Sequence, residues 1–554
     1  MKATNWLTGT SLSITAVLVM PLCIVAFSLF SIDTQLWSHL LNTVFAEYVT
    51  NSLILAISVG LGSIVIGSYL AYIMVNYRFI GHRVLSWLIL LPLAMPAYII
   101  AYTYTGLLDF TGPVQSTLRQ LFSLERGEYW FWDVRSLSGA IIMMILVFYP
   151  YVYILARTAF SEQSSSFEQV SALAKRTRWQ HIRQVALPLA RPAILTGASL
   201  AMMEALADYG TVAYFGVSTF STGIFRTWFG MGDIQGAAQL STVLCMFVLV
   251  LLVIEKRSRK DAQQYQTSLN KKLRAKKTSG VKGIVLCLLC LLPVLFGFVI
   301  PFTQLLIWSI NYADIGDWPA FFDVVKNSFT LALMGAVIIV IIALIVSYAK
   351  RMQLNKIRTH NGLSDKFSPK SVSASERILS LGYALPGIVI AVGVLILSGW
   401  FDQNINRLTM TWFDYRPGLI LSGGLGALLI AYSIRFVSVA LQNTETGMAR
   451  IPNKVDNAAL SLQGSAWTML RRIHIPMLSG SLISASLLVF VDILKELPAT
   501  LVLRPFNFNT LAVRAFELAS DERLIDAALP AISIVLVGLI PVILLTRQLN
   551  KLSA

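Results

Sequence analysis

Long apolar stretches, separated by short polar connections, recur along the whole chain. Two examples are "SLSITAVLVMPLCIVAFSLF" (11–30) and "GAVIIVIIALIVSY" (335–348), which lack the charged face of a helix on a soluble core. A helix needs roughly 20 mainly apolar residues to cross a bilayer. We therefore expect about twelve membrane-spanning helices, near residues 9–31, 51–75, 84–107, 137–158, 192–215, 236–254, 283–310, 328–349, 377–399, 418–441, 477–503 and 528–546.

The composition supports this interpretation. Of the 554 residues, 56% are hydrophobic and only 13% are charged, a balance typical of membrane proteins rather than of soluble multidomain chains. The predicted fold is an all-α integral membrane protein embedded in a lipid bilayer.

The net charge of +16 raises the question of a nucleic-acid partner. Most Lys and Arg residues, however, lie on alternate connections between the predicted spans. With the N-terminus inside, the basic cytoplasmic segments are Arg78 to Arg83, Arg157 to Arg191, Lys256 to Lys282, Lys350 to Arg377, Arg435 to Arg472 and the tail with Arg547 and Lys551. This positive-inside pattern predicts that both termini are cytoplasmic and that the chain binds no nucleic acid.

The chain also contains an internal duplication. The basic stretch 255–280 is expected to be a cytoplasmic linker between a first domain, 1–254, and a second domain, 281–554, each with about six spans. At an offset of 288 the halves align without gaps, pairing Trp179 with Trp467, Pro188 with Pro476, Glu204 with Asp492, Asp208 with Glu496, Phe220 with Phe508, Thr222 with Thr510 and Arg226 with Arg514. This run of matches indicates duplicated domains.

Acidic residues recur on one predicted span of each half. Glu204 and Asp208 are four residues apart, as are Asp492 and Glu496 beside Lys495, so each pair shares one helix face. Charges at bilayer depth face protein or a wet cavity. Two roles stay open: these residues line or gate a pathway, or the four acids pair with Lys495 or cap broken helix ends.

Gly210 and Pro498 occupy paired positions just after these charges. Both residue types weaken a helix, so each span is expected to be interrupted within the membrane. An interruption is tolerated only where the backbone faces protein or water.

A long cytoplasmic loop precedes each charged helix: "FEQVSALAKRTRWQHIRQVALPLARPAI" (167–194) and "VDNAALSLQGSAWTMLRRIHIPMLSGSLI" (455–483). These loops resemble the EAA loops of ABC importer permeases, EAA-x3-G-x9-I-x-L-P, over 167–190 and 455–478. The resemblance implies coupling to an ATPase through Gln169, Val170, Ser171, Lys175, Trp179, Pro188, Asn457, Ala458, Ala459, Gln463, Trp467 and Pro476. The pair Ala458–Ala459 of the second loop, Ile473 and both prolines match the EAA pattern. The residues at the Glu and Gly positions of the pattern do not match in either loop.

Three further segments extend the resemblance over essentially the whole chain: "LPLAMPAYIIAYTYTGLLDFTGP" (91–113), "ADYGTVAYFGVSTFSTGIFRTWF" (207–229) and "KELPATLVLRPFNFNTLAVRAFELA" (495–519). Together they resemble the fused, two-domain permeases of ferric iron ABC importers. The resemblance implies two homologous type I permease halves in a bacterial inner membrane, a cytoplasmic ATPase homodimer and a periplasmic ferric-iron-binding protein.

Arg226 and Arg514 follow the charged helices on the predicted periplasmic side. Either they contact an acidic face of that binding protein, or they pair with nearby acids such as Asp233 and Glu517. The sequence does not identify the residues that contact iron.

The chain has no Gly-Lys dipeptide and so no G-x-x-x-x-G-K-[ST] phosphate loop. We therefore expect a transport subunit that is not an enzyme and holds no cofactor, with ATP used by a partner. Within the ABC class a permease for thiamine or another small solute is the alternative. A secondary transporter with about twelve helices is less well matched, because it needs no paired coupling loops.

Overall fold

The computed structural model describes residues 2–31, 34–125, 128–161, 177–260, 276–311, 318–359, 369–461 and 465–553, and these are almost entirely helical. The β structure among them is one short parallel pair, β1 (Tyr77–Arg78) with β2 (Lys276–Lys277), which joins the end of the basic linker to the first predicted cytoplasmic connection. The all-α expectation is confirmed.

Within the described residues, ten helices are long and apolar enough to cross a membrane. They run over Trp6–Phe30, Phe45–Asn76, Leu137–Ser161, Ile182–Ala207, Ile234–Arg257, Val281–Asn311, Trp318–Gln353, Gly387–Phe413, Leu425–Ala449 and Ala466–Lys495. A helix pair bent by 91°, His82–Ala94 with Ala97–Phe122, and a shorter apolar helix, Ala528–Leu544, occupy the two remaining predicted positions. Each expected span therefore has a helical counterpart.

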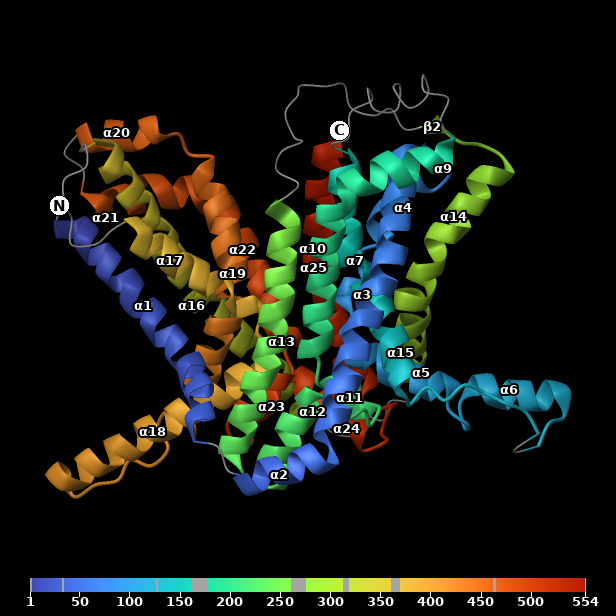
Figure 1. Cartoon of the computed structure of the whole chain (residues 1–554), viewed down its shortest axis with the longest axis horizontal. Coiled ribbons are helices and arrows are strands. Elements are labelled where there is room, and N and C mark those ends of the chain that lie inside the picture. Colours follow the sequence, from blue (N-terminus) through green and yellow to red (C-terminus); the bar gives the residue numbers. More distant parts are fainter. Residues whose placement is uncertain are drawn as a thin grey trace. The chain divides into compact units, whose positions relative to one another are not determined.

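The chain folds into two compact units that do not follow the sequence halves (Figure 1). Unit 1 comprises Met1–Asp33, Thr227–Thr242 and Asp317–Val513, and unit 2 comprises Thr34–Arg226, Val243–Gly316 and Arg514–Ala554. Residues Met1–Asp33, which hold the first helix, thus lie in unit 1 with most of the second half of the sequence. The predicted spans 283–310 and 528–546 of the second half lie in unit 2 with most of the first half. The predicted boundaries at 254 and 281 stay a prediction for the repeat, and each compact unit takes segments from both sides of them.

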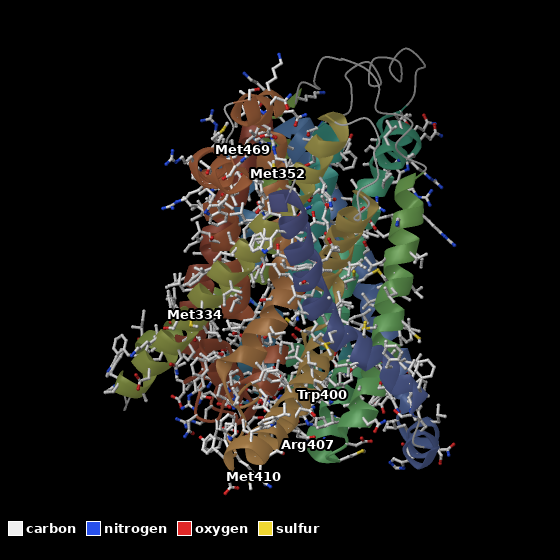
Figure 2. The ribbon with its side chains drawn as sticks, turned by 90° about the vertical axis from the view of Figure 1, so that its left-hand side faces the viewer. Met334, Met352, Trp400, Arg407, Met410 and Met469 are labelled. Carbon is white, nitrogen blue, oxygen red and sulfur yellow. The ribbon has the colours of Figure 1, made fainter. Side chains whose placement is uncertain are left out.

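Unit 1 is built on three mutually packed helices, α16, α19 and α22, with α1 alongside α16, α17 and α18. Its elements are α1 (Lys2–Phe27), η1 (Ser28–Phe30), α16 (Trp318–Thr359), α17 (Pro369–Ser380), η7 (Gly382–Ala384), α18 (Gly387–Phe413), α19 (Leu425–Ala449), α20 (Asn453–Ser461), α21 (Ala466–Met469), η8 (Leu470–His474), α22 (Ile475–Lys495) and α23 (Pro498–Leu503). Figure 2 shows Trp400, Arg407 and Met410 in the C-terminal half of α18.

Unit 2 repeats this plan with α3, α7 and α10 as its packed core, and α15 lies against α5 and α25. Its elements are α2 (Thr34–Thr43), α3 (Phe45–Asn76), α4 (His82–Leu88), η2 (Leu91–Ala94), α5 (Ala97–Leu108), α6 (Pro113–Phe122), α7 (Leu137–Ser161), α9 (Arg178–His181), η3 (Ile182–Ala186), α10 (Leu187–Ala207), α11 (Gly210–Tyr214), α12 (Phe220–Phe225), α14 (Val281–Val294), η6 (Leu295–Val299), α15 (Ile300–Asn311) and α25 (Ala528–Ser553). Three elements pass from one unit to the other: η4 (Arg226–Gly230), α13 (Ile234–Lys260) and α24 (Leu511–Ser520).

The helix boundaries reproduce the duplication. Both ends of α7 recur 288 residues later in α19, and both ends of α10 recur at the same offset in α22. Each of these last two helices is preceded by a five-residue π-helical turn, η3 in unit 2 and η8 in unit 1, again at that offset. π-Helical turns are rare, so this match strengthens the repeat.

Small residues allow the core helices of unit 2 to approach closely. A Cβ added at Gly67 on α3 would lie 2.7 Å from Cβ of Val152, and one added at Gly197 on α10 would lie 2.6 Å from Cα of the same residue. Both glycines thus pack against one turn of α7. Close backbone approach at small residues is a main source of helix association in membranes, where lipid is as apolar as the side chains.

Gly197→Ala is expected to lower the apparent melting temperature of the detergent-solubilised protein, because the new methyl group meets the backbone of α7 and overpacking costs about 1–3 kcal/mol. The matched control is Gly480→Ala on α22, where an added Cβ meets nothing within 4 Å. There the better helix propensity of Ala predicts an unchanged or raised melting temperature. Equal effects of the two substitutions would contradict the close packing of α10 on α7.

Candidate functional site

Both charged helices stop inside the apolar part of the chain and restart after two residues. In unit 2, α10 ends at Ala207 and α11 begins at Gly210; in unit 1, α22 ends at Lys495 and α23 begins at Pro498. The predicted interruptions are confirmed. Each break falls on the second member of an acidic pair, Asp208 or Glu496.

These two carboxylates cap the helices that follow the breaks. The N–H of Thr211 donates to Oδ1 of Asp208 over 2.8 Å. The N–H groups of Ala499 and Thr500 donate to Glu496 over 2.9 and 3.0 Å, and the Thr500 hydroxyl donates to the same carboxylate over 2.6 Å. A negative charge at a helix N-terminus satisfies backbone N–H groups that have no helical partner and interacts favourably with the helix dipole.

Glu496 also lies beside an arginine that is largely but not fully buried. Its side chain is 1% exposed, and Oε1 lies 3.5 Å from Nη1 of Arg435, whose side chain is 12% exposed. The first residue of α18, Gly387, is adjacent, and a Cβ there would lie only 2.6 Å from Oε1 of Glu496. The Thr500 hydroxyl that bonds Glu496 also contacts the Tyr432 hydroxyl, at 2.6 Å.

Arg435 lies where two sequence predictions overlap, the span 418–441 and the basic segment that begins with Arg435. In the structure α19 continues through it to Ala449. The partner carboxylate of Glu496 lets this charged residue lie within a largely apolar helix. The offset of 288 pairs Arg435 with Val147, so unit 2 has no equivalent charge on α7.

The other acidic members of the predicted set lie one turn earlier. Glu204 on α10 and Asp492 on α22 are half-buried, as is Lys495 at the end of α22. The structure therefore places Glu204 with Asp208 in unit 2, and Asp492, Lys495 and Glu496 together in unit 1. Their role in a pathway or gate stays a prediction.

The predicted coupling loops are only partly described. Gln169, Val170, Ser171, Lys175 and Gln463 lie outside the described residues. Pro188 and Pro476 are each the second residue of a spanning helix, α10 and α22. Trp179 and Trp467 lie at equivalent positions just before the π-helical turns and are 68% and 64% exposed, a large apolar surface in each unit.

In the second loop α20 has one exposed and one buried face. Asn457 and Ala458 are exposed together with Asn453, Lys454 and Ser461, while Val455, Asp456 and Ala459 turn toward the unit. The spacing of the exposed residues follows the helical period, so they form one stripe. The two alanines of the motif consequently face opposite ways: Ala458 outward and Ala459 into an apolar cluster with Met352, Met448 and Met469.

Arg226 and Arg514, the predicted periplasmic contacts, lie near the ends of short helices. Arg226 begins η4 and donates to the Ser218 hydroxyl over 3.4 Å. Arg514 is half-buried within α24. Asp233, suggested as a partner for Arg226, accepts hydrogen bonds from the N–H groups of Gln235 and Gly236 at the start of α13.

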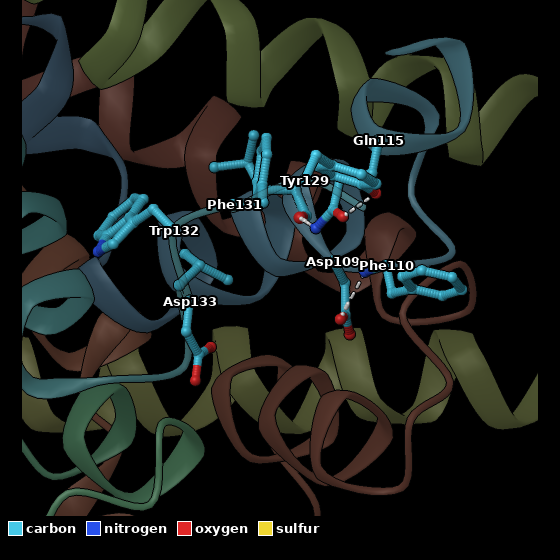
Figure 3. Close-up of a pocket in the computed structure, with 9 residues that line it drawn as sticks. Asp109, Phe110, Gln115, Tyr129, Phe131, Trp132 and Asp133 are labelled. Carbon is cyan, nitrogen blue, oxygen red and sulfur yellow. Dashed lines mark hydrogen bonds between the residues drawn. The ribbon is translucent and has the colours of Figure 1, made fainter. Parts of the chain in front are cut away.

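Sequence reasoning missed a pocket of about 370 Å³ in unit 2, between the end of α5 and the start of α7 (Figure 3). Arg119 donates to the Tyr129 hydroxyl over 2.9 Å, Tyr129 donates to Oε1 of Gln115 over 2.7 Å, and Gln115 donates to the Leu108 carbonyl over 2.8 Å. These bonds attach α6 and the following loop to the end of α5. No sequence motif pointed to them, because they join polar residues of ordinary spacing.

Two carboxylates, Asp109 and Asp133, also line this pocket. Arg135 lies beside both: its Nη2 is 3.5 Å from Asp109, and its backbone N–H donates to Asp133 over 2.9 Å. The same guanidinium makes two hydrogen bonds to Glu522, of 2.7 and 2.9 Å. Among the described residues, no group of three or more His, Cys, Asp or Glu side chains is arranged to hold a metal ion.

One protein family matches part of the first half of the chain. Residues 63–254, from α3 to α13, match the family described as binding-protein-dependent transport system inner membrane component. This range includes the first predicted coupling loop, α10 and the helix break at Asp208.

Individual relatives extend over more of the chain. It is 25% identical over 516 residues to the Fe(3+)-transport system permease protein FbpB 2 of Haemophilus influenzae, covering 91% of this chain and 90% of that protein. The ferric transport system permease protein FbpB of Actinobacillus pleuropneumoniae is 23% identical, over 82% of this chain and 64% of that protein. The molybdenum transport system permease protein ModB of Haemophilus influenzae is 24% identical, but over only 37% of this chain and 86% of that protein.

Glu496→Gln is expected to destabilise the protein by about 3 kcal/mol, because it leaves Arg435 buried without a counter-charge. Arg435→Met should cost less in the Glu496→Gln background than in the wild type, since the unpaired charge is then removed. Melting temperatures of the four proteins in detergent measure this coupling. Glu204→Gln, at a half-buried carboxylate one turn before the other break, serves as the control. Additive effects of the two substitutions would show that the pair does not interact.

The Arg135 contact predicts an acid-sensitive contribution to stability. Arg135 holds the pKa of Glu522 below its usual range. The stabilisation is therefore present above the unfolded-state pKa of about 4.3 and is lost as the pH falls through the lower folded-state value. The melting temperature of Glu522→Gln should lie below that of the wild type at pH 7, and the difference should disappear on acidification. A difference that persists at the lowest pH would contradict this assignment.

Proposed function

We propose that this chain, a permease with the inner-membrane domain of binding-protein-dependent transport systems, is the membrane component of an ABC importer for ferric iron. A periplasmic binding protein delivers the iron, and a separate cytoplasmic ATPase homodimer hydrolyses the ATP. The chain lies in a bacterial inner membrane with both termini in the cytoplasm, as the distribution of Lys and Arg favours.

The coverage of the alignments carries the substrate assignment. The ferric iron permease of Haemophilus influenzae aligns over 91% of this chain, including both repeats. The molybdenum permease aligns over about a third of the chain, as expected if it shares one permease domain only. Similarity that extends through both halves supports a fused permease of the ferric type over a permease for another solute.

The geometry suggests how a movement of the ATPase is transmitted to the spanning helices. The exposed stripe of α20, with Asn457 and Ala458, is the docking face for the ATPase, together with Trp467 on α21. Helix α21 continues through η8 into α22 without a break. A push on the loop is therefore carried along one continuous helix to the break at Glu496. The equivalent path in unit 2 runs from Trp179 through η3 and α10 to Asp208.

Alternating access requires that ATP binding favours one of two arrangements. Breaks that are capped by Asp208 and Glu496 let α11 and α23 change their angle to the preceding helix while the backbone N–H groups stay satisfied. Glu204, Asp492 and Lys495 are the candidates for lining the pathway next to the breaks. Arg226 and Arg514 are the candidates for contact with the binding protein.

The proposal is tested by uptake of radiolabelled ferric iron into iron-starved cells that lack this gene and carry the wild type or Ala458→Arg. The wild type should restore uptake. Ala458→Arg should lower it about tenfold or more, because an arginine on the docking face weakens ATPase binding by at least about 1.4 kcal/mol. The ATPase that co-purifies with the permease should fall in parallel.

Ala458→Ser is the matched control, since it keeps the docking face small. Ala459 is unsuitable for this test because it is 8% exposed and a polar substitution there would disturb the apolar cluster. Normal iron uptake in the deletion strain, with loss of thiamine uptake, would overturn the substrate and leave the importer class. Full uptake and full ATPase retention by Ala458→Arg would overturn the docking face.

A further inference from the structure

A buried polar network ties the second coupling helix to the core of unit 1. Asp456 on α20 and His474 in η8 are both fully buried, and Arg351 near the end of α16 is 9% exposed. The Asp456 carboxylate accepts a hydrogen bond from Nε of Arg351 over 2.8 Å and one from Nε2 of His474 over 2.9 Å. One side chain therefore joins α20 to η8, whose histidine is 18 residues later, and to α16, whose arginine is 105 residues earlier.

The same arginine reaches the end of a fourth element. Nη1 of Arg351 donates to the Met448 carbonyl in the last turn of α19, and Nη2 donates to the Ile451 carbonyl just beyond it, over 2.9 Å. One turn earlier on α16, the Tyr348 hydroxyl donates to the Ala466 carbonyl at the start of α21, over 2.7 Å. Arg351 and Tyr348 thus connect α16 to both ends of the loop.

Apolar packing closes over this network. Met352, Met469 and Leu478 belong to one buried cluster with Ala459, the inward alanine of the coupling motif. Figure 2 shows Met352 and Met469 near each other at the same end of the unit. In such a low-dielectric environment a satisfied network resists rearrangement, because separating any member leaves a buried charge or donor without a partner.

The first half of the repeat lacks two members of the network. His474 pairs with Ala186 at the offset of 288, and both end a π-helical turn. Alignment of "NSLILA" (51) with "NSFTLA" (327) pairs Arg351 with Val75. The residue paired with Asp456 is Glu168, which lies outside the described residues. The Arg–Asp–His arrangement is therefore specific to the second coupling loop.

We propose that Asp456, with Arg351 and His474, is a positioning residue that makes α20, α16 and α22 move as one body when the ATPase acts. The two loops then have different roles, because the second transmits force directly into two spanning helices through an arginine and a histidine whose counterparts in the first half are Val75 and Ala186. This inference rests on the proposed function, because it assumes that α20 meets an ATPase.

The experiment uses the complex of permease and ATPase in lipid nanodiscs and measures backbone hydrogen exchange with and without ATP. In the wild type, ATP should change the exchange of α20 and of the ends of α16 and α22 together. In Asp456→Asn, the change in α20 should persist while the changes in α16 and α22 are lost. His474→Ala should behave in the same way, and His474→Gln, whose amide donates to Asp456, should restore the wild-type response.

Iron imported per ATP hydrolysed, measured in proteoliposomes with the binding protein, gives the functional readout. Asp456→Asn should lower this ratio about fivefold or more, the size of an ordinary coupling effect. The control is Glu445→Gln, which removes the negative charge 3.0 Å from Nζ of Lys350, next to Arg351 on α16, but does not involve α20. It should lower stability and leave the ratio unchanged.

A purely structural role would appear as a lower melting temperature with an unchanged ratio and an unchanged ATP response in α16 and α22, and would overturn the inference. Loss of the ATPase from Asp456→Asn would overturn it as well, because Asp456 would then support docking rather than transmission. If the wild type imports no iron, the proposed substrate fails, but the hydrogen-exchange response to ATP still decides the role of Asp456.

Discussion

A helix that stops within a membrane leaves backbone N–H groups that lipid cannot satisfy. In this protein Asp208 and Glu496 provide the acceptors at the two breaks, and the rest of each unit is arranged around them. The short helices α11 and α23 begin on these carboxylates, and the spanning helices α10 and α22 end at them. Replacing either cap by an apolar side chain would leave N–H groups of the following helix without an acceptor.

The two caps are chemically alike but differently supported. Glu496 lies beside Arg435, Gly387 and the Tyr432–Thr500 hydroxyl pair, whereas the position equivalent to Arg435 in unit 2 is Val147. The buried Arg–Asp–His network is likewise confined to unit 1 among the described residues. The duplicated backbone thus carries two different sets of buried charges, as expected when the two halves of a duplicated protein have different roles.

The exchange of outer helices has a physical consequence for stability. Because α1 packs on α16, α17 and α18, and α15 packs on α5 and α25, neither sequence half contains all the helices of one compact unit. Apolar helices find no hydrophobic driving force against one another in lipid, so these contacts depend on shape and on small residues. Gly393 on α18 illustrates this, since a Cβ there would lie 2.5 Å from the Pro21 carbonyl oxygen of α1.

Hydrophobicity, charge and repeat spacing were sufficient to predict the spans, the duplication and the helix breaks near Gly210 and Pro498, because each depends on local composition or on a residue's own backbone preference. The same pattern gave Arg435 no partner, since a charge in an apolar run carries no mark of a distant carboxylate. It also treated Ala458 and Ala459 as equivalent, although the helical period turns one outward and one inward. The partners of Glu496, the Arg351–Asp456–His474 network and the membership of each compact unit were decided by tertiary structure alone, because they join residues far apart in the sequence and depend on burial that no local window contains.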